Sequence, residues 1–580
     1  MYRTHTCGAL RKTDDKKNVT LSGWIVNPKN HGGLLFTYLR DRYGKTQLVF
    51  DSADKDMFKK ASDLRREDVV RIEGTVRKRP ENMANKDIAT GDVEVVVTKL
   101  DIINKCAPLP IEIDENVNTS EEMRLKYRYL DLRRDSMQYK MLLRHMVINA
   151  AREYMNKNNF LEIETPMLVK STPEGARDYV VPSRVNQGSF YALPQSPQLY
   201  KQILMIAGMD RYYQIARCMR DEDLRADRQP EHTQIDLEMS FVTSDELRDM
   251  IEGLYKHIFK KVLNITLKDF EVFSYWEVME RYGTDKPDLR YGLELTDVTK
   301  IVHKTDFKVF TGAEKVSCVV AGKDYSRKDI DKFTEIAKKA GAKGLAYVKV
   351  IKDGCDSGVA KFLAETIQKE LIKKTGAKEG STIFFAADER KKALSVLGEL
   401  RRVLAEDLDI IDKNAFRFCW VKDFPLFAWN EDEKRWEPEH HMFSMPKPEF
   451  VDEFEKHPGE VIGDLWDLVL NGSELGSGSI RVSNPEIQER IMNLIGFDKK
   501  EAHERFGFLL DAYKYGGPVH GGMGLGADRL VALMAGTQDI REVIAFPKNK
   551  AAQCPMDGSP GAIDAKQLDE LGIKIERHKK

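Results

Sequence analysis

The chain has 580 residues, of which 42% are hydrophobic and 32% are charged, and its net charge at pH 7 is −1. This composition is typical of a globular protein long enough for three or four domains, each with its own core. A net charge near zero excludes a uniformly basic nucleic-acid-binding chain, although one part of a neutral chain can still be basic.

Neither a leader peptide nor a membrane span is expected. The N-terminus, MYRTHTCGALRKTDDKKN, has no apolar segment, and no apolar run approaches the roughly 18 residues that cross a bilayer. The seven cysteines show no CxxC spacing, which argues against a zinc site and against a disulfide framework. We therefore expect a cytoplasmic protein in a reducing compartment, with no membrane partner.

Residues 1–105 are predicted to form an OB-fold β-barrel. Five short segments with strand composition lie within residues 19–103, with a helix expected at Lys55–Leu64 after the third. The segment is basic, with 21 Lys and Arg against 15 Asp and Glu, which permits a polyanionic partner. OB-folds bind single-stranded nucleic acid by stacking its bases on aromatic rings. Phe36 is the candidate stacking ring and Gln47 the candidate reader of base edges. The alternative for Phe36 is a place in the barrel core.

A connecting hinge is expected at residues 106–135, stiffened at its start by Pro108 and Pro110. A helix is then predicted from about Ser136 to Lys157, because apolar residues recur along one face. The segment FLEIETPML (160–168) predicts a strand that meets Pro166. On these residues alone, this is an ordinary helix–strand unit.

The first candidate binding groups lie between residues 172 and 202. TPEGARDYVVPS (172–183) is predicted to be a loop with Glu174 at its tip, and the helix that follows presents Gln198 and Lys201 on one face. In a pocket for a dicarboxylic amino acid, Glu174 accepts from the α-ammonium group and Lys201 meets a carboxylate. The alternative is a capped helix start with a solvated lysine.

Residues 213–241 predict two strands joined by a long charged loop. Ile235, Leu237, Met239 and Phe241 alternate with polar residues, which is the period of a half-buried strand, and residues 213–219 predict its partner. The loop at 221–232 is too long for a tight turn, and its arginines suit the phosphates of a nucleoside triphosphate. A surface hairpin with exposed ion pairs is the alternative, because such pairs are worth only about 0–1 kcal/mol.

The second half of the chain divides at about residue 415. Between 288 and 415, amphipathic helices alternate with short strands and no catalytic cluster is recognisable. Further on, Asp467 and Glu474 are candidate ligands of Mg²⁺, and Arg481 follows a Gly/Ser loop that permits close approach to a carboxylate. GGMGLGADRLVALMAG (521–536) contains a GxGxxG-like match, but no acidic residue after a βαβ unit supports a nicotinamide enzyme.

Three segments resemble the signature motifs of class II aminoacyl-tRNA synthetases. MRDED with RADRQPEHTQID resembles motif 2, the helix and strand meeting Pro166 resemble motif 1, and GGMGLGADRL resembles motif 3. TPEGARD and QSPQLYK resemble the aspartate-binding segments of the bacterial aspartyl type, within subclass IIb. Two departures stand out: Met219 replaces the usual phenylalanine of motif 2, and NPKNHGG (27–33) replaces an arginine-rich segment, which leaves Lys29 as its cation.

The resemblance implies an α+β protein that ligates L-aspartate to tRNA at the expense of ATP. It implies an OB-fold anticodon-binding domain at 1–105, a hinge at 106–135 and a catalytic domain with an antiparallel sheet at 136–287 and 416–555. An α/β insertion domain at 288–415, expected near the tRNA acceptor arm, interrupts the catalytic domain, and residues 556–580 form a C-terminal extension. A homodimer, Mg²⁺ with the ATP, tRNA(Asp) and, for the relaxed type of these enzymes, tRNA(Asn) are the implied partners.

The resemblance also implies roles for individual residues. Arg220 and Arg529 are the implied catalytic residues. Arg220 would contact the α-phosphate of ATP, and Arg529 would make a cation–π contact with adenine. The implied contacts to aspartate are Glu174, Gln198, Lys201, Arg220, Asp236, His440 and Arg481. The implied contacts to ATP are Arg220, Asp221, Glu222, Gln229, Glu474, Gly526, Ala527, Asp528 and Arg529, with Asp467 and Glu474 as the metal ligands.

The same comparison bears on the tRNA and on the alternatives. Phe36, Gln47 and Lys29 are the implied anticodon contacts. His31 matches the residue associated with the relaxed type, whereas Met83, near the second such position, matches neither pattern. A catalytically silent RNA-binding relative is the main alternative, and the presence of Arg220, Glu222, Glu474 and Arg529 disfavours it.

Overall fold

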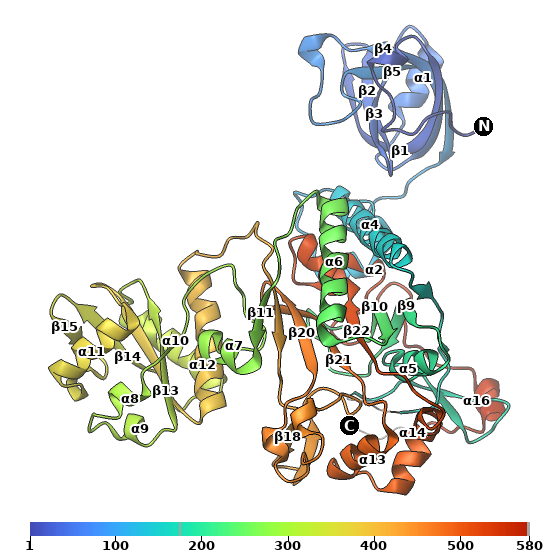
Figure 1. Cartoon of the computed structure of the whole chain (residues 1–580). Helices are drawn as coiled ribbons and strands as arrows, with labels where there is room; N and C mark the ends of the chain where they lie inside the picture. The colour runs from blue at the N-terminus through green and yellow to red at the C-terminus, as the bar shows by residue number, and fades with distance from the viewer. Residues whose placement is uncertain (173–175, 577–580) are drawn as a thin grey trace. The chain divides into compact units, whose positions relative to one another are not determined.

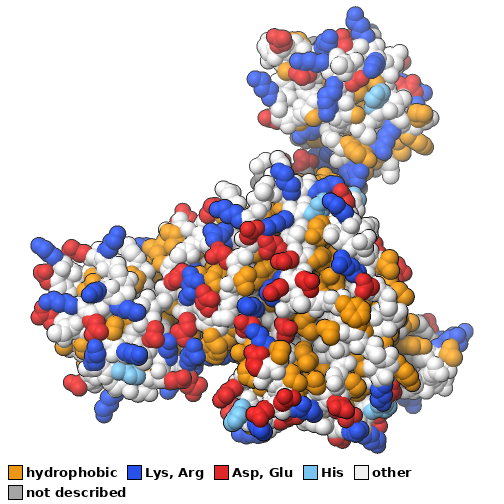
Figure 2. All heavy atoms as spheres, viewed as in Figure 1, with side chains coloured by type: hydrophobic (Ala, Val, Ile, Leu, Met, Phe, Trp, Pro, Cys, Tyr) orange, Lys and Arg blue, Asp and Glu red, His pale blue; other side chains and the backbone are white. Residues whose placement is uncertain are grey.

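The computed structural model describes residues 1–172 and 176–576, which divide into two compact units, Met1–Tyr139 and Lys140–Lys580. Each unit is described by itself (Figure 1). On the face drawn in Figure 2, Lys and Arg side chains are interspersed with Asp and Glu over the surface, as the near-zero net charge suggests. Within the described ranges, no helix combines the length and apolar character that a membrane span requires. All seven cysteines are free thiols.

The first unit is built on a closed five-stranded barrel, which confirms the predicted OB-fold. The barrel order is β1-β2-β3-β5-β4, and β2 alternates strictly between half-buried and buried residues, as a barrel wall requires. The strands are β1 (Asn18–His31), β2 (Leu34–Asp41), β3 (Gly44–Asp51), β4 (Val69–Lys78) and β5 (Val93–Asn104), and helix α1 (Lys55–Ser62) lies between β3 and β4.

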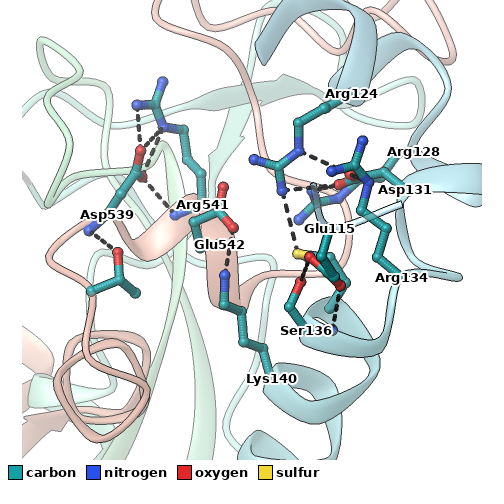
Figure 3. A network of polar contacts seen from close by, with 12 residues as sticks. Glu115, Arg124, Arg128, Asp131, Arg134, Ser136, Lys140, Asp539, Arg541 and Glu542 are labelled. Atoms are coloured by element: carbon teal, nitrogen blue, oxygen red, sulfur yellow. Dashed lines mark hydrogen bonds and ion pairs between the residues drawn. The ribbon is translucent and has the colours of Figure 1, made fainter. Parts of the chain in front are cut away.

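The segment after the barrel contains two short helices, α2 (Glu121–Lys126) and α3 (Arg128–Asp131). Arg124, Arg128 and Arg134 converge on the carboxylate of Asp131 at 2.8, 2.6 and 3.3 Å (Figure 3). In the second unit, Figure 3 also draws two separate pairs, Arg541 with Asp539 and Lys140 with Glu542, both at 2.7 Å. Such networks fix the loops that carry them.

An eight-stranded sheet organises the second unit, as predicted for an antiparallel catalytic domain. Its order is β11-β17-β20-β21-β22-β10-β9-β6, and only the two outermost pairs, β11 with β17 and β6 with β9, run parallel. The strands are β6 (Leu161–Glu162), β9 (Arg211–Met219), β10 (Glu231–Ser240), β11 (Glu271–Ser274), β17 (Phe418–Lys422), β20 (Leu465–Leu470), β21 (Ser473–Ile480) and β22 (His520–Gly526).

One face of this sheet is apolar and covered. Leu237 of β10 and Met523 of β22 share a buried cluster with residues of α4 (Asp135–Lys157), α6 (Ser244–Leu263) and α15 (Ala527–Met534). Because side chains alternate along a strand, the opposite face receives the polar residues of the central strands.

Further elements around this sheet are β7 (Val180–Pro182), β8 (Phe190–Ala192), α5 (Gln198–Ile206), α7 (Tyr275–Tyr282), β18 (Phe427–Asn430), β19 (Arg435–Pro438), α13 (Pro485–Leu494), α14 (Lys499–Tyr513) and α16 (Ala565–Leu571).

Between β11 and β17 the chain forms a separate five-stranded sheet, in the order β12-β13-β16-β14-β15, with all neighbours antiparallel. Its helices and strands alternate along the chain, as the sequence indicates. They are β12 (Thr296–Asp297), α8 (Thr299–Val302), α9 (Lys308–Thr311), β13 (Lys315–Ala321), α10 (Arg327–Lys339), β14 (Ala346–Ile351), β15 (Gly354–Asp356), α11 (Glu365–Thr375), β16 (Thr382–Asp388) and α12 (Arg390–Asp407).

Four local predictions are wrong. Two segments expected to be loops contain strands: Ser473–Ile480, before Arg481, form β21, and Val180–Pro182, within 172–183, form β7. Phe241 does not continue the apolar face of β10, because the strand ends at Ser240; Phe241 has φ +53° and is 80% exposed. The strand predicted at 160–168 is reduced to Leu161 and Glu162, which pair in parallel with Tyr212 and Tyr213. Ile163 still donates its N–H to the carbonyl of Tyr213 at 3.1 Å, but the N–H of Thr165 donates to the side chain of Gln214 at 3.2 Å and not to the backbone of β9.

Candidate active site

The polar face of β10 lies opposite a strand of glycines. Gln234, Asp236 and Glu238 pair in register with Gly526, Gly524 and Gly522 of β22. A Cβ atom on Gly522 would lie 1.8 Å from Oε2 of Glu238, so only glycine leaves room for that carboxylate. These glycines therefore serve a central antiparallel strand, and they do not form the strand-to-helix turn of a βαβ dinucleotide site.

Four buried charges form the floor of the site. Lys201 of α5 contacts Asp236 at 2.9 Å and Glu238 at 3.2 Å, and Nε of Arg481 donates to Glu238 at 2.9 Å. Nη1 of Arg481 also donates to Ser479 at 2.8 Å. Two cations thus balance two carboxylates, which is the condition for burying such groups. Glu238 was absent from the predicted site residues, although its place in the period-2 polar pattern of β10 was a usable signal.

The two carboxyl groups titrate differently. Burial raises the pKa of Asp236 above its ordinary value, although Lys201 favours the charged form. Burial would also raise the pKa of Glu238, but the charges of Arg481 and Lys201 outweigh it and lower the pKa from 4.5 to about 2. Glu238 is therefore a fixed anion that holds Arg481 in place.

Several buried polar atoms around a cleft of about 1310 Å³ have no hydrogen-bond partner among the described residues. They are Nε2 of Gln198, Nε of Arg220, Oδ2 of Asp236 and Oδ1 of Asp467. Buried polar groups are almost always paired, so a set of unpaired groups lining one cleft indicates a ligand site. All four were predicted site residues, and the structure brings them to one cleft.

Arg220 lies directly after β9, where its N–H group donates to the carbonyl of Pro230 at 2.8 Å. Within the connecting loop, Glu222 pairs with Arg228 at 2.9 Å, and Asp221 donates its N–H to the carbonyl of Arg177 at 3.1 Å. These contacts fix the ends of the loop while the Arg220 side chain faces the cleft.

In the segment GGMGLGADRL (521–530), Arg529 is partly exposed and its neighbour Asp528 is buried. Arg529 donates to the carbonyl of Glu474 and lies 3.4 Å from Asp227, with its side chain partly exposed to the cleft. Asp528 is buried instead; it accepts from the N–H of Thr233 at 2.7 Å and pairs with Arg144. Asp528 thus ties the start of α15 to β10.

Gln229 likewise binds its own chain. Its amide group donates to the carbonyl of Lys548 at 3.1 Å and accepts from the N–H of Lys548 at 2.8 Å. Gly526 ends β22 and Ala527, which is buried, begins α15.

Asp467 and Glu474, the predicted metal ligands, face the cleft from neighbouring strands. Burial, reinforced by the charge of Glu474, raises the pKa of Asp467 well above its usual value. Burial would raise the pKa of Glu474 too, but Lys286, 2.8 Å away, lowers it. Nδ1 of His440 lies 3.9 Å from Asp467 and 3.2 Å from the Ser477 hydroxyl. A cation at Asp467 would offset this unfavourable burial, so the pair fits Mg²⁺ with its remaining ligands supplied by phosphates.

In the part of the chain that the structure describes, no three His, Cys, Asp or Glu residues are arranged to hold a metal by themselves. Glu174 lies outside the described residues, so its expected contact with aspartate stays a prediction.

Comparison with known proteins then decides the family. A model of the class II tRNA synthetases (D, K and N) matches residues 120–550, and a model of the OB-fold nucleic acid binding domain matches residues 19–103. The chain belongs to the class II tRNA synthetases of the D, K and N group.

Individual relatives of this synthetase match along almost the whole chain. It is 50% identical to the aspartate–tRNA(Asp/Asn) ligase of Treponema denticola, over 99% of each chain. It is 48% identical to the aspartate–tRNA ligase of Agathobacter rectalis, over 99% of this chain and 98% of that one. The asparaginyl-tRNA synthetase of Pyrococcus horikoshii, solved with asparaginyl-adenylate, shares the fold at 21% identity with a TM-score of 0.61, covering 94% of this chain and 98% of that one.

The barrel of the synthetase places its predicted nucleic-acid contacts on adjacent strands. Lys29 of β1 pairs in register with Phe36 of β2, which is half buried, and Gln47 of β3 pairs with Tyr38. Nε2 of Gln47 donates to Glu94 at 2.8 Å, which leaves its second N–H and its Oε1 for a base, although the residue is only 8% exposed. Glu94 therefore lies next to a predicted anticodon contact, and the sequence does not indicate it.

The two residues linked with tRNA choice lie at turns of the barrel unit. His31 is the last residue of β1, and Met83 ends a short 3₁₀ turn (Glu81–Met83) and is largely exposed. Their roles stay predictions.

Proposed function

We propose that this synthetase joins L-aspartate to tRNA(Asp) in two steps. The α-carboxylate of aspartate attacks the α-phosphorus of ATP, which releases pyrophosphate and forms aspartyl-adenylate; the terminal ribose hydroxyl of the tRNA then takes the aspartyl group and AMP leaves. The observation that carries the proposal is the buried pair of cations, Lys201 and Arg481, in one cleft with Arg220, whose Nε has no partner among the described residues. The names of the full-length relatives support aspartate as the amino acid.

Within the site, Arg481 and Lys201 are assigned to the side-chain carboxylate of aspartate. A carboxylate has two oxygens that can accept hydrogen bonds from the two cations, whereas the amide of asparagine has one acceptor oxygen and turns N–H donors towards the second cation. The hydrogen bond left unmade costs about 1–3 kcal/mol, which favours aspartate. Gln198 and Asp236, whose Nε2 and Oδ2 are unpaired among the described residues, are assigned to the amino-acid backbone.

The nucleotide is assigned to the other half of the cleft. Arg220 is placed at the α-phosphate, where negative charge develops, and Arg529 against the adenine ring. Asp467 and Glu474 would hold Mg²⁺, which neutralises phosphate charge when bound. The chain otherwise acts by aligning the two substrates, because neither step needs a covalent intermediate with the protein. A reaction that consumes ATP and tRNA is expected in the cytoplasm.

The test of this function is charging with purified tRNA. We expect aspartate-dependent ATP–pyrophosphate exchange and charging of tRNA(Asp). We also expect charging of tRNA(Asn) with aspartate, because three relatives named aspartate–tRNA(Asp/Asn) ligase align over nearly the whole chain. Asparagine in place of aspartate is the matched control and should give no exchange. Binding of tRNA without exchange would instead identify a catalytically silent relative.

We also propose that the synthetase is a homodimer through the region of α4 and β6. Leu142 of α4, Leu161 of β6 and Leu168 are 50%, 51% and 51% exposed, and large exposed apolar side chains are candidates for an interface between subunits. Sedimentation should give twice the 66.5 kDa mass of the chain. Leu161→Glu should yield monomers, whereas Val185→Glu, at an exposed position elsewhere, should not; a monomeric wild type contradicts the proposal.

A further inference from the structure

A loop that the sequence did not single out reaches the nucleotide half of the cleft. Residues 283–292 leave α7, and Nζ of Lys286 lies 2.8 Å from the carboxylate of Glu474. The backbone carbonyl of the same Glu474 accepts from the guanidinium of Arg529. Lys286 and Arg529 therefore meet at a single residue of β21, although they are far apart in the sequence.

This loop is held in place from the insertion domain. Nη2 of Arg401, on α12, donates to the carbonyls of Asp288, Tyr291 and Gly292 at 3.0, 3.1 and 2.9 Å. The guanidinium of Arg401 also lies over the Tyr291 ring, 4.2 Å from its centroid, and is 2% exposed. A buried arginine that satisfies three carbonyls fixes the loop backbone.

The start of the loop is packed just as closely. Gly283 has φ +70°, and a Cβ atom there would lie 2.3 Å from the carbonyl oxygen of Leu394 and 2.7 Å from the Cα of Gly398, both on α12. Only glycine fits such a position. The path of the loop to Lys286 is thus set by α12 at both ends.

The charges of the cleft leave a role for Lys286. Lys201 and Arg481 are assigned to aspartate and Arg220 to the α-phosphate, whereas Lys286 lines the same cleft beside Glu474. A lysine ammonium group is a common phosphate ligand, and Lys286 would share the charge of the β- and γ-phosphates with Mg²⁺.

We propose that Lys286 binds the β- and γ-phosphates of ATP, the pyrophosphate leaving group, and that Arg401 is the residue that positions its loop. Lys286 exchanges the Glu474 carboxylate for phosphate oxygens when the nucleotide enters. This inference rests on the proposed function, since it names a further contact of the same site. It also gives the insertion domain a role in binding ATP.

The test compares ATP with AMP, because AMP lacks the two phosphates that Lys286 is proposed to bind. In Lys286→Met we expect the dissociation constant for ATP, measured by titration calorimetry, to rise about 10- to 100-fold, while that for AMP stays near the wild-type value. Lys286→Arg should recover most of the ATP affinity. Lys323→Met, which removes a lysine paired with Asp407 at 3.0 Å in the insertion domain, is the matched control.

Two results would overturn the inference: unchanged ATP binding, or an equal loss for ATP and AMP, which would mean that Lys286 acts only by holding Glu474. Failure of the proposed function is a different result, because it shows in wild-type protein as absent aspartate-dependent exchange.

The positioning role of Arg401 is tested by a double-mutant cycle. Arg401→Lys keeps the charge but loses both Nη2, which donates to the three carbonyls, and the guanidinium plane over the Tyr291 ring. We expect it to raise the KM for ATP and to leave the KM for aspartate unchanged. In the Lys286→Met background the same substitution should have no further effect on ATP. Additive losses would mean that Arg401 does not act through Lys286, and they would remove that part of the inference.

Discussion

Replacing Arg220 by alanine is expected to reduce aspartate-dependent ATP–pyrophosphate exchange by about 10²- to 10³-fold, because a preorganised cation at the reacting phosphate is lost. The folded state should be unaffected. The backbone contact of Arg220 with Pro230 remains, and Nε of the side chain has no partner among the described residues. Exchange kinetics together with the midpoint of thermal unfolding measure both effects.

The matched control for this experiment is Arg225→Ala. Arg225 lies in the same loop, is exposed, and does not line the cleft. Exchange without tRNA should therefore be close to that of the wild type. If Arg220→Ala retained near-normal exchange, the assignment of Arg220 to the α-phosphate would be wrong.

Replacing Arg481 by methionine is expected to have the second large effect, on both binding and stability. The KM for aspartate should rise at least about 100-fold, because a guanidinium–carboxylate pair is lost from a buried site. Stability should fall by about 3–5 kcal/mol, because Glu238 keeps only Lys201 as a partner. Denaturant unfolding measures the second effect.

A double variant separates the two consequences. Arg481→Met with Glu238→Gln removes the unpaired charge, so part of the stability should return while aspartate binding stays lost. Arg490→Met is the control, since Arg490 forms a partly exposed pair with Glu455 and its removal should cost less than about 1 kcal/mol. Normal aspartate affinity in Arg481→Met would contradict the assigned pocket.

The pH dependence of stability follows from the same pair. The folded pKa of Glu238 is lowered from 4.5 to about 2, so its contribution to stability is complete above about pH 4.5 and is lost as the pH falls towards 2. The double variant lacks this group. Its unfolding free energy should therefore fall less steeply than that of the wild type across this range.

Much of the fold follows from patterns that are local in the sequence. The alternation at residues 234–240 predicts β10 and assigns Asp236 to the polar face, and the five strand-like segments at 19–103 predict the barrel. The wrong predictions also have local causes. At Phe241 the backbone enters the left-handed region, and the N–H of Thr165 donates to a side chain, that of Gln214, so β6 is not continued there.

The pairings within the site could not be predicted in the same way. Lys286 meets Glu474, and Gln47 meets Glu94, only after distant segments have packed together. Gln229 and Asp528, expected to contact ATP, hold Lys548 and Thr233 of their own chain. A motif indicates which residues gather around a site, whereas the structure shows which of them, such as Gln229 and Asp528, also bind their own chain while they line the cleft.

The glycines of β22 that face β10 restrict how the amino-acid pocket can change during evolution. Every missense change of a glycine codon introduces a side chain, and at Gly522 or Gly524 that side chain would meet Glu238 or Gln234. A new amino-acid specificity therefore cannot arise by adding side chains at these glycines of β22. They must come from exchanges on its neighbours, where a residue already projects and can be replaced by one of similar volume.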